Sequence, residues 1–322
     1  MTILALPANQ PETFYRGAGR IAAFRRDPGL PDRPEDWIAS TTSRFGLAPS
    51  GLTVLPDGRV LAEAIGDDPT WWLGPDRTET GILVKLLDAG QRLPLHVHPD
   101  RRFAHAHLAS PYGKTEAWVI VSAEPDAFVH LGFHRDVERA ELAGWVNEQK
   151  VDEMLAATNR IPIRAGDAVL CPAGVPHAIG AGVLLIEVQE PTDFSVLLEY
   201  EGFALDGPAD GHLTLGYDQA LECVDRSTWT RERIAELRGT DRVLPAAAEA
   251  FFSVERLRPE DRLDAAFSVV VVTEGSGVLS GDHDRVAVSR GDTLLIPYAA
   301  GPLTLTGDVE AVRLSTPHAG RQ

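Results

Sequence analysis

The sequence predicts a mainly β protein that consists of two similar β-barrels, with a small α-helical insertion in the first. The 322 residues include 29 glycines and 23 prolines, and their apolar runs are short. This composition is typical of many strands joined by turns and argues against a helical bundle. A pattern of an apolar run, Gly-Asp, a second apolar run and Pro occurs at 163–174 and again at 286–301. Such a repeat indicates two similar structural units in one chain.

The first eighty residues contain little regular pattern, except at 52–64. There the turn Pro-Asp-Gly predicts a hairpin that passes into a short helix. After residue 80, each run of apolar and β-branched residues between turns predicts a strand. These predicted strands cover 82–87, 93–97, 117–122, 127–132, 161–164, 168–171 and 182–189. We expect 117–122 to pair with 127–132, which follows it after a short turn.

The strand pattern is interrupted from about 136 to 160, where apolar residues recur at intervals of three and four, as in an amphipathic helix. Later, the composition Leu-Asp-Gly-Pro-Ala-Asp-Gly at 205–211 is typical of a linker. The sequence therefore predicts an N-terminal domain over 1–205, which contains the helical insertion, and a C-terminal domain over 206–322.

The net charge of −17 argues against nucleic acid as a partner, because binding to phosphates requires clustered lysines and arginines. The two cysteines, Cys171 and Cys223, provide no disulfide framework and fit a reducing compartment. We expect no membrane span, because no apolar stretch is long enough, and no secretory signal, because no basic region precedes the short apolar start. These features predict a soluble cytoplasmic protein.

The sequence His96-Val97-His98 places two imidazoles on the same face of a strand, because side chains alternate between faces. A carboxylate at Glu116 and a third imidazole at His177 could complete a four-ligand site of the kind that divalent transition metals bind. The His-x-His spacing alone fits equally well with a surface strand or a chance repeat. The second copy of the repeat has no histidine that matches His177, so only the first barrel is predicted to hold a metal.

Longer motifs favour the metal site. Gly90-x5-His96-x-His98 and Gly166-x5-Pro172-x-Gly174-x2-His177 resemble the two motifs of the cupin superfamily of jelly-roll barrels. Within that superfamily, the chain resembles type I phosphomannose isomerase (mannose-6-phosphate isomerase), most closely its short bacterial form with two barrels. The segments that carry this resemblance are 35–40, 93–100, 113–118, 176–178 and 185–189.

The resemblance implies a zinc-dependent aldose–ketose isomerase that interconverts mannose 6-phosphate and fructose 6-phosphate. It implies His96, His98, Glu116 and His177 as the metal ligands. It also implies that Lys114 lies near the charged end of the substrate, and that Glu187 and Asp193 belong to an acidic wall of the active site. The base that moves the proton is one of Lys114, Glu187 and Asp193.

The chain departs from the family's usual residues at three positions, which are His96, Ile179 and Leu197. Imidazole replaces the usual glutamine at His96, which preserves metal binding. Ile179 stands in place of a tyrosine, and Leu197 stands in place of an arginine that is thought to assist the chemistry or bind anionic oxygens. Leucine provides no charged donor. Either another cation, among Arg101, Arg102 and Arg135, has taken over, or the substrate is a different sugar, phosphorylated or free.

Two other classes of function remain open from the sequence. Three histidines and a glutamate also suit iron, manganese or nickel, so a cupin oxygenase is an alternative. A non-catalytic sugar-binding protein is the other, since the arginine position is lost. Of the remaining histidines, we expect His105 and His107 to be loop residues after the metal motif, or hydrogen-bond partners of the ligands, and not ligands themselves. We expect His130 and His134 to line or flank the barrel. The sequence contains no signal for the oligomeric state.

Overall fold

The computed structural model describes residues 2–239, 243–282 and 284–316. These ranges form a mainly β structure with three antiparallel sheets, which confirms the predicted mainly β class. The first sheet has five strands, in the order β2 (Glu35–Ile38), β3 (Leu83–Ala89), β10 (Val183–Gln189), β5 (Glu116–Ala123) and β8 (Ala168–Cys171). The second also has five, in the order β11 (Val196–Leu197), β4 (His96–Val97), β9 (His177–Ile179), β6 (Phe128–Phe133) and β7 (Thr158–Pro162).

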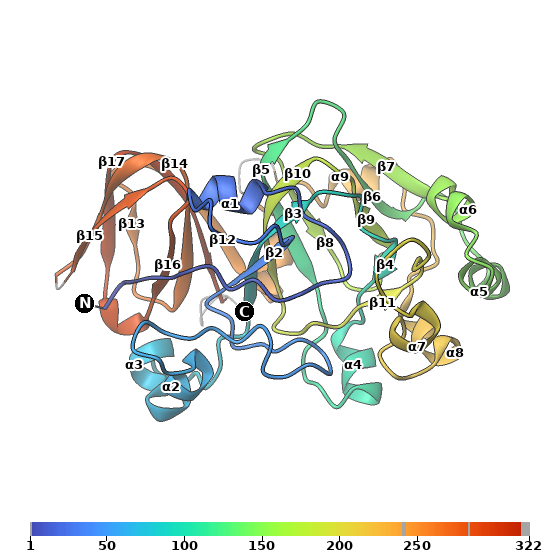
Figure 1. The fold of residues 1–322 in the computed structure, drawn as a ribbon, viewed down its shortest axis with the longest axis horizontal. Coiled ribbons are helices and arrows are strands. Elements are labelled where there is room, and N and C mark those ends of the chain that lie inside the picture. The colour runs from blue at the N-terminus through green and yellow to red at the C-terminus, as the bar shows by residue number, and fades with distance from the viewer. Residues whose placement is uncertain (1, 240–242, 283, 317–322) are drawn as a thin grey trace.

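The third sheet has seven strands and lies at the opposite end of the molecule from β6 and β7 (Figure 1). Its main path is β1 (Leu4–Ala5), β16 (Thr293–Ile296), β14 (Ser268–Ser280), β17 (Leu303–Ser315) and β12 (Ser253–Leu257). β13 (Arg262–Leu263) pairs with β17, and β15 (Arg285–Ser289) pairs with β14. The first strand of the chain thus belongs to the sheet that is otherwise formed by the last strands.

The expected pairing of 117–122 with 127–132 is wrong. β5 pairs with β10 and β8 in the first sheet, whereas β6 pairs with β7 and β9 in the second. The turn between them, closed by a hydrogen bond from the Ala127 amide to the Glu124 carbonyl, carries the chain from one sheet to the other. The place beside β5 is taken by β10, all of whose residues are buried. Adjacency in sequence did not decide the pairing. A fully buried strand such as β10 gains more stabilising free energy from a central position in a sheet than from an edge position.

Short helices fill the connections. They are α1 (Arg20–Arg25), α2 (Leu61–Asp67), α3 (Pro69–Leu73), α4 (Arg101–His107), α5 (Arg139–Asn147), α6 (Val151–Ala156), α7 (Gly207–Asp210), α8 (Tyr217–Ala220) and α9 (Arg231–Ala235), with 3-10 turns η1 (Leu221–Cys223), η2 (Ala246–Ala250) and η3 (Tyr298–Ala300). The segment 136–160, for which we predicted helix, contains α5 and α6 and then the first residues of β7. None of the helices in the described ranges combines the length and apolar composition that a membrane span requires.

The predicted loop around His105 and His107 is wrong, because both residues lie in α4. The carboxylate of Asp100 accepts a hydrogen bond from the Phe103 amide at 2.7 Å and caps the helix. Phe103 and Ala104 are buried, and His105 and His107 are exposed. An N-cap aspartate followed by buried apolar residues stabilises a helix more than the alternating histidines favour an extended chain.

Candidate metal centre and active site

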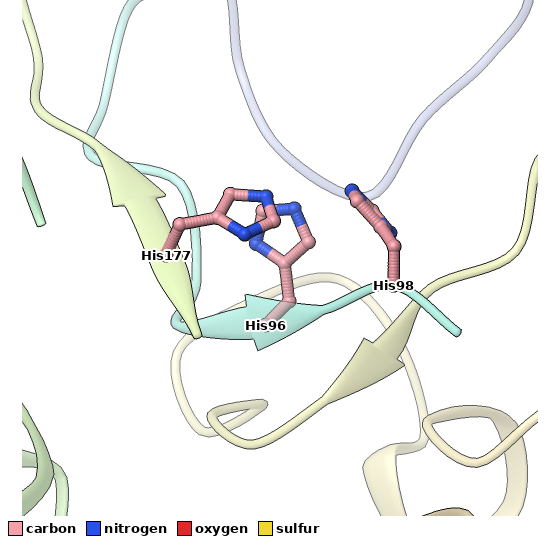
Figure 2. Close-up of side chains that lie close together, drawn as sticks. All are labelled: His96, His98 and His177. Atoms are coloured by element: carbon pink, nitrogen blue, oxygen red, sulfur yellow. The ribbon is translucent and has the colours of Figure 1, made fainter. Parts of the chain in front are cut away.

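Three histidines meet between strands of the second sheet (Figure 2). His96 lies on β4 directly opposite His177 on β9, and His98 follows β4. The ring centroids of His96 and His177 are 4.1 Å apart, and the His98 ring lies 4.9 Å from the His96 ring and 4.8 Å from the His177 ring. All three side chains are buried. The strand pairing therefore brings together the imidazoles that the sequence motifs placed 79 positions apart (177 − 98).

A backbone carbonyl contacts Nδ1 of each ring. The distances are 2.9 Å from His96 to Pro94, 2.7 Å from His98 to Phe194, and 2.9 Å from His177 to Val175. A carbonyl oxygen can only accept, so each Nδ1 carries the proton and each Nε2 keeps a lone pair. Ligating histidines in metalloproteins are usually oriented in this way.

Glu116, the first residue of β5, faces the histidines from the first sheet. Its Oε2 lies 3.0 Å from Nε2 of His98, and its Oε1 lies 3.2 Å from Nε2 of His177. Trp118 donates to Oε1 from 3.0 Å and fixes the carboxylate. The ammonium of Lys114 lies 2.8 Å from Nε2 of His98 and 3.2 Å from Oε2 of Glu116. A positively charged group thus already contacts the inward-facing atoms of this cluster.

Burial and neighbouring charges set the charge states of His96, His98 and Glu116. Burial lowers the pKa of His98 to about 3 and lowers the pKa of His96 well below its ordinary value, so both imidazoles are neutral at physiological pH. Burial by itself would raise the pKa of Glu116, but the positive charge of Lys114 is the largest influence in the opposite direction, and the pKa is held well below its ordinary value. The cluster therefore offers neutral nitrogen donors and one ionised carboxylate.

These groups fit a divalent transition metal. Nε2 of His177 is buried without a hydrogen-bond partner, and Oε2 of Glu116 has none besides its ion pair with Lys114, although buried polar atoms are normally hydrogen-bonded. A cation among the four side chains would satisfy both atoms, and nitrogen donors with one carboxylate are a common donor set for such metals. Cys171 also brings its sulfur close to Glu116 and His177. Its register opposite Glu116 on β8 places it there.

The cluster borders a cavity of about 570 Å³. His96, Glu116 and the three predicted catalytic residues, Lys114, Glu187 and Asp193, all line it. The fold therefore gathers residues from β4, β5, β10 and the segment after β10 around one space. A volume of this size is in the range of small-molecule sites.

The sequence did not reveal a second buried charge network in this cavity. The ammonium of Lys85 on β3 lies 3.4 Å from Glu187 and 3.5 Å from Glu35. Glu35 also accepts hydrogen bonds from Tyr15 and, at 2.6 Å, from Trp37. The available signal was a lysine inside the otherwise apolar run 82–87, because a charged residue in a buried strand needs buried partners.

Glu187 differs from Glu116 and Glu35, the two other buried glutamates that line this cavity. Its pKa is raised, first by burial and then by the negative charge of Glu116, and Lys85 offsets only part of this. Glu35 has the opposite outcome, because Lys85 and its hydrogen bonds overcome burial and lower its pKa. A carboxyl group with a raised pKa beside a reaction cavity is suited to carry a proton.

The positions that depart from the family give the cavity an apolar side. Leu197 and Ile179 both line it. Arg101, Arg102 and Arg135 are not among the described residues that line it: Arg101 pairs with Glu190 at 2.5 Å, and Arg135 pairs with Glu141 at 2.6 Å. Among the described residues, the arginine that lines the cavity is Arg44, which no pattern in the sequence singles out.

The remaining histidines that the structure describes lie outside the cluster. His130 contacts the hydroxyl of Thr158 at 2.7 Å, His134 contacts the Ala156 carbonyl at 2.9 Å, and His107 contacts Gln219 at 2.8 Å. These contacts hold neighbouring segments together.

Comparison with known proteins gives consistent results. Residues 244–316 match the family model of the mannose-6-phosphate isomerase cupin domain. Mannose-6-phosphate isomerase ManA of Bacillus subtilis is 31% identical over 243 residues, which cover 72% of this chain and 73% of that protein. Mannose-6-phosphate isomerase of Streptococcus mutans is 27% identical over 239 residues, which cover 72% of each chain.

Solved structures share the fold. A putative mannosephosphate isomerase from Archaeoglobus fulgidus superposes with a TM-score of 0.77 at 18% identity and covers 97% of both chains. The mannose 6-phosphate isomerase from Bacillus subtilis superposes with a TM-score of 0.75 at 22% identity, covering 98% of this chain and 99% of that one.

Proposed function

The chain belongs to the mannose-6-phosphate isomerase family, and from this premise we propose that it is a metal-dependent aldose–ketose isomerase that interconverts mannose 6-phosphate and fructose 6-phosphate. The observation that carries the proposal is the cluster of neutral imidazoles and one carboxylate beside a cavity that also contains candidate proton carriers. We take His96, His98, Glu116 and His177 as the metal ligands and Zn²⁺ as the metal. When bound, the ion supplies Lewis-acid polarisation of the sugar's oxygens.

The reaction moves one proton between two adjacent carbons of the open-chain sugar, so the protein must supply a group that takes the proton and returns it. Lys114, Glu187 and Asp193 are the candidates, and all line the cavity. The raised pKa of Glu187 favours this residue, because a stronger base takes a carbon-bound proton more readily. Lys114 neutralises Glu116, and Asp193 faces Arg44 at 3.6 Å. We assign these two to positioning and charge balance.

We further propose that the two five-stranded sheets are the two walls of one cupin barrel, within a domain over 1–205 that has its helical insertion at about 136–160. Apart from β1, which lies within 1–205, the strands of the seven-stranded sheet would form a second cupin barrel without metal, within 206–322. The match of 244–316 to a cupin domain supports the second assignment. We also propose a cytoplasmic location.

A second candidate is an isomerase for an unphosphorylated sugar, which the apolar Leu197 favours. Product NMR separates the two. Metal-reconstituted protein is incubated with mannose 6-phosphate, fructose 6-phosphate, mannose and fructose. We expect conversion of the two phosphates, and conversion of a free sugar alone would replace the proposed substrate. Consumption of oxygen during turnover would instead indicate an oxygenase, and binding of sugar without conversion would indicate a sugar-binding protein.

A further inference from the structure

Arg44 lies where two cavities meet. It belongs to the loop between β2 and α2 and lines both the cavity beside the metal cluster and a neighbouring cavity of about 700 Å³. The two cavities share four residues, Arg44, Phe45, Gly46 and Asp193. A ligand that extends from the metal cluster to this point would reach the guanidinium.

The other two cations of the cavity beside the cluster are already engaged. Lys85 and Lys114 are 2% and 4% exposed, and each neutralises buried carboxylates. Moving either of them to a substrate would leave buried negative charge uncompensated, which is costly. The side chain of Arg44 is 19% exposed. It is therefore the cation in this cavity that can bind an incoming anion at low cost.

The guanidinium is fixed on one side and available on the other. Nη1 of Arg44 donates to the carbonyl of Glu12, and Nε lies 3.6 Å from Oδ2 of Asp193, which is too far for a hydrogen bond. Asp193 instead accepts from the backbone amide of Phe45 at 3.2 Å and so holds the loop. In the described part of the chain, Nη2 has no hydrogen-bond partner. The planar fork of an arginine matches phosphate oxygens.

Another residue that lines the same cavity, Leu197, shows why this chain would need such a cation. Leu197 is 4% exposed and lines the same cavity from β11, paired in register with His96. An apolar side chain at this point cannot compensate a dianionic group. A positive charge for the substrate must then come from another element, and the loop that carries Arg44 provides it.

We propose that Arg44 binds the phosphoryl group of the substrate and thereby selects a sugar phosphate over the free sugar. This inference rests on the proposed isomerase function. It makes Arg44 a specificity-determining residue that acts on binding and not on proton transfer.

The test compares Arg44→Gln and Arg44→Lys with the wild type, and uses Arg135→Gln as a control that removes an exposed arginine outside the cavity. We expect Arg44→Gln to raise KM for mannose 6-phosphate roughly ten- to hundredfold, because hydrogen bonds to a charged group are lost, while kcat stays within a few-fold. Arg44→Lys keeps the charge but loses the fork, so its KM lies between the two. Turnover of free mannose, and all parameters of Arg135→Gln, stay at the wild-type level. Equal losses with mannose 6-phosphate and mannose would overturn the inference.

A binding measurement separates this inference from the proposed function. Calorimetric titration with inorganic phosphate needs no turnover, and we expect Arg44→Gln to weaken phosphate binding by a similar factor. If the wild type converts no mannose 6-phosphate, the proposed function is wrong, yet the calorimetry still decides the role of Arg44. A wild type that binds no phosphate, or an Arg44→Gln protein with unchanged affinity, contradicts the inference. If Arg44→Gln does not fold, the comparison of Arg44→Lys with the wild type still tests the inference.

Discussion

At the scale of single residues, backbone carbonyls decide which nitrogen each histidine offers. Pro94, Phe194 and Val175 each hold one Nδ1, and the three Nε2 atoms are left for a ligand. Two of the carbonyls, those of Pro94 and Val175, belong to the residue two positions before the histidine. The local backbone conformation is therefore sufficient to orient His96 and His177. The third belongs to the segment after β10, and it depends on the tertiary fold.

His98→Ala should abolish metal binding at stoichiometric levels and reduce turnover by at least about a hundredfold, because it removes a ligand whose neighbours remain buried. Metal content by mass spectrometry and isomerase activity measure the two effects. His105→Ala is the matched control, since this histidine is exposed on α4 outside the cluster. A His98→Ala protein that retains one bound metal would contradict the ligand assignment.

Glu187→Gln should lower kcat roughly 10²- to 10⁴-fold without changing the metal content. The exposed Glu124→Gln serves as its control. In the wild type, the raised pKa of Glu187 means that the base becomes protonated at a higher pH than an ordinary glutamate. Activity should therefore fall on the acid side at a pH above 4.5, the ordinary value, and a profile of kcat/KM against pH measures it. A Glu187→Gln enzyme with wild-type kcat would exclude this residue as the base.

Much of this site was accessible from the sequence, because alternation along a strand relates His96 to His98 without tertiary information. Lys85 was a missed signal, since a lysine within an apolar strand implies buried partners. Arg44 gave no signal at all. Its position depends on contacts with Glu12 and Asp193, which are distant in sequence and join only in the folded chain.

At the scale of elements, α4 shows how one cap outweighs a repeated pattern. We expected His105 and His107 to lie in a loop, whereas Asp100 after Pro99 is a helix start signal. Reasoning from local sequence patterns failed for β5 and β6, which we expected to pair with each other. Their short connection is typical of a hairpin, but the choice of partner depends on β10, whose residues lie more than 60 positions later (183 − 117).

Asp100→Ala should destabilise the protein by about 1 kcal/mol, because the amide of Phe103 loses its acceptor. Asp206→Ala is a close control: this aspartate is also exposed and also stands at an N-cap, of α7, but its side chain makes no capping hydrogen bond. Chemical denaturation of both variants measures the difference. Equal effects on the free energy of unfolding would show that the cap does not stabilise α4.

At the scale of the whole molecule, the beginning and the end of the chain share a sheet. Leu4 and Ala5 pair with Leu295 and Leu294. The side chain of Arg25 reinforces this contact: it donates to Asp36 at 2.7 Å and to the hydroxyl of Thr293 at 2.6 Å. The internal repeat predicted two units from the sequence. The pairing of β1 with β16 was not predictable, because a strand of only two residues shows no sequence periodicity.

Arg25→Met should cost about 3–5 kcal/mol of stability, because Asp36 is fully buried and would lose its compensating charge. Arg26→Met is the neighbouring control, since Arg26 is 51% exposed and its pair with Asp292 is at the surface. Surface pairs contribute about 0–1 kcal/mol. Denaturant titration measures both variants, and similar midpoints would refute a structural role for Arg25.

The position of β1 also bears on how the polypeptide matures. During translation, β1 precedes its partners on β16 by some 290 residues (294 − 5, 295 − 4). Until β16 has been synthesised, β1 has no strand to pair with. Such a long-range closure is slow compared with local folding. We therefore expect the segment around β1 to remain accessible to proteases until β16 has emerged, whatever the state of the metal cluster by then.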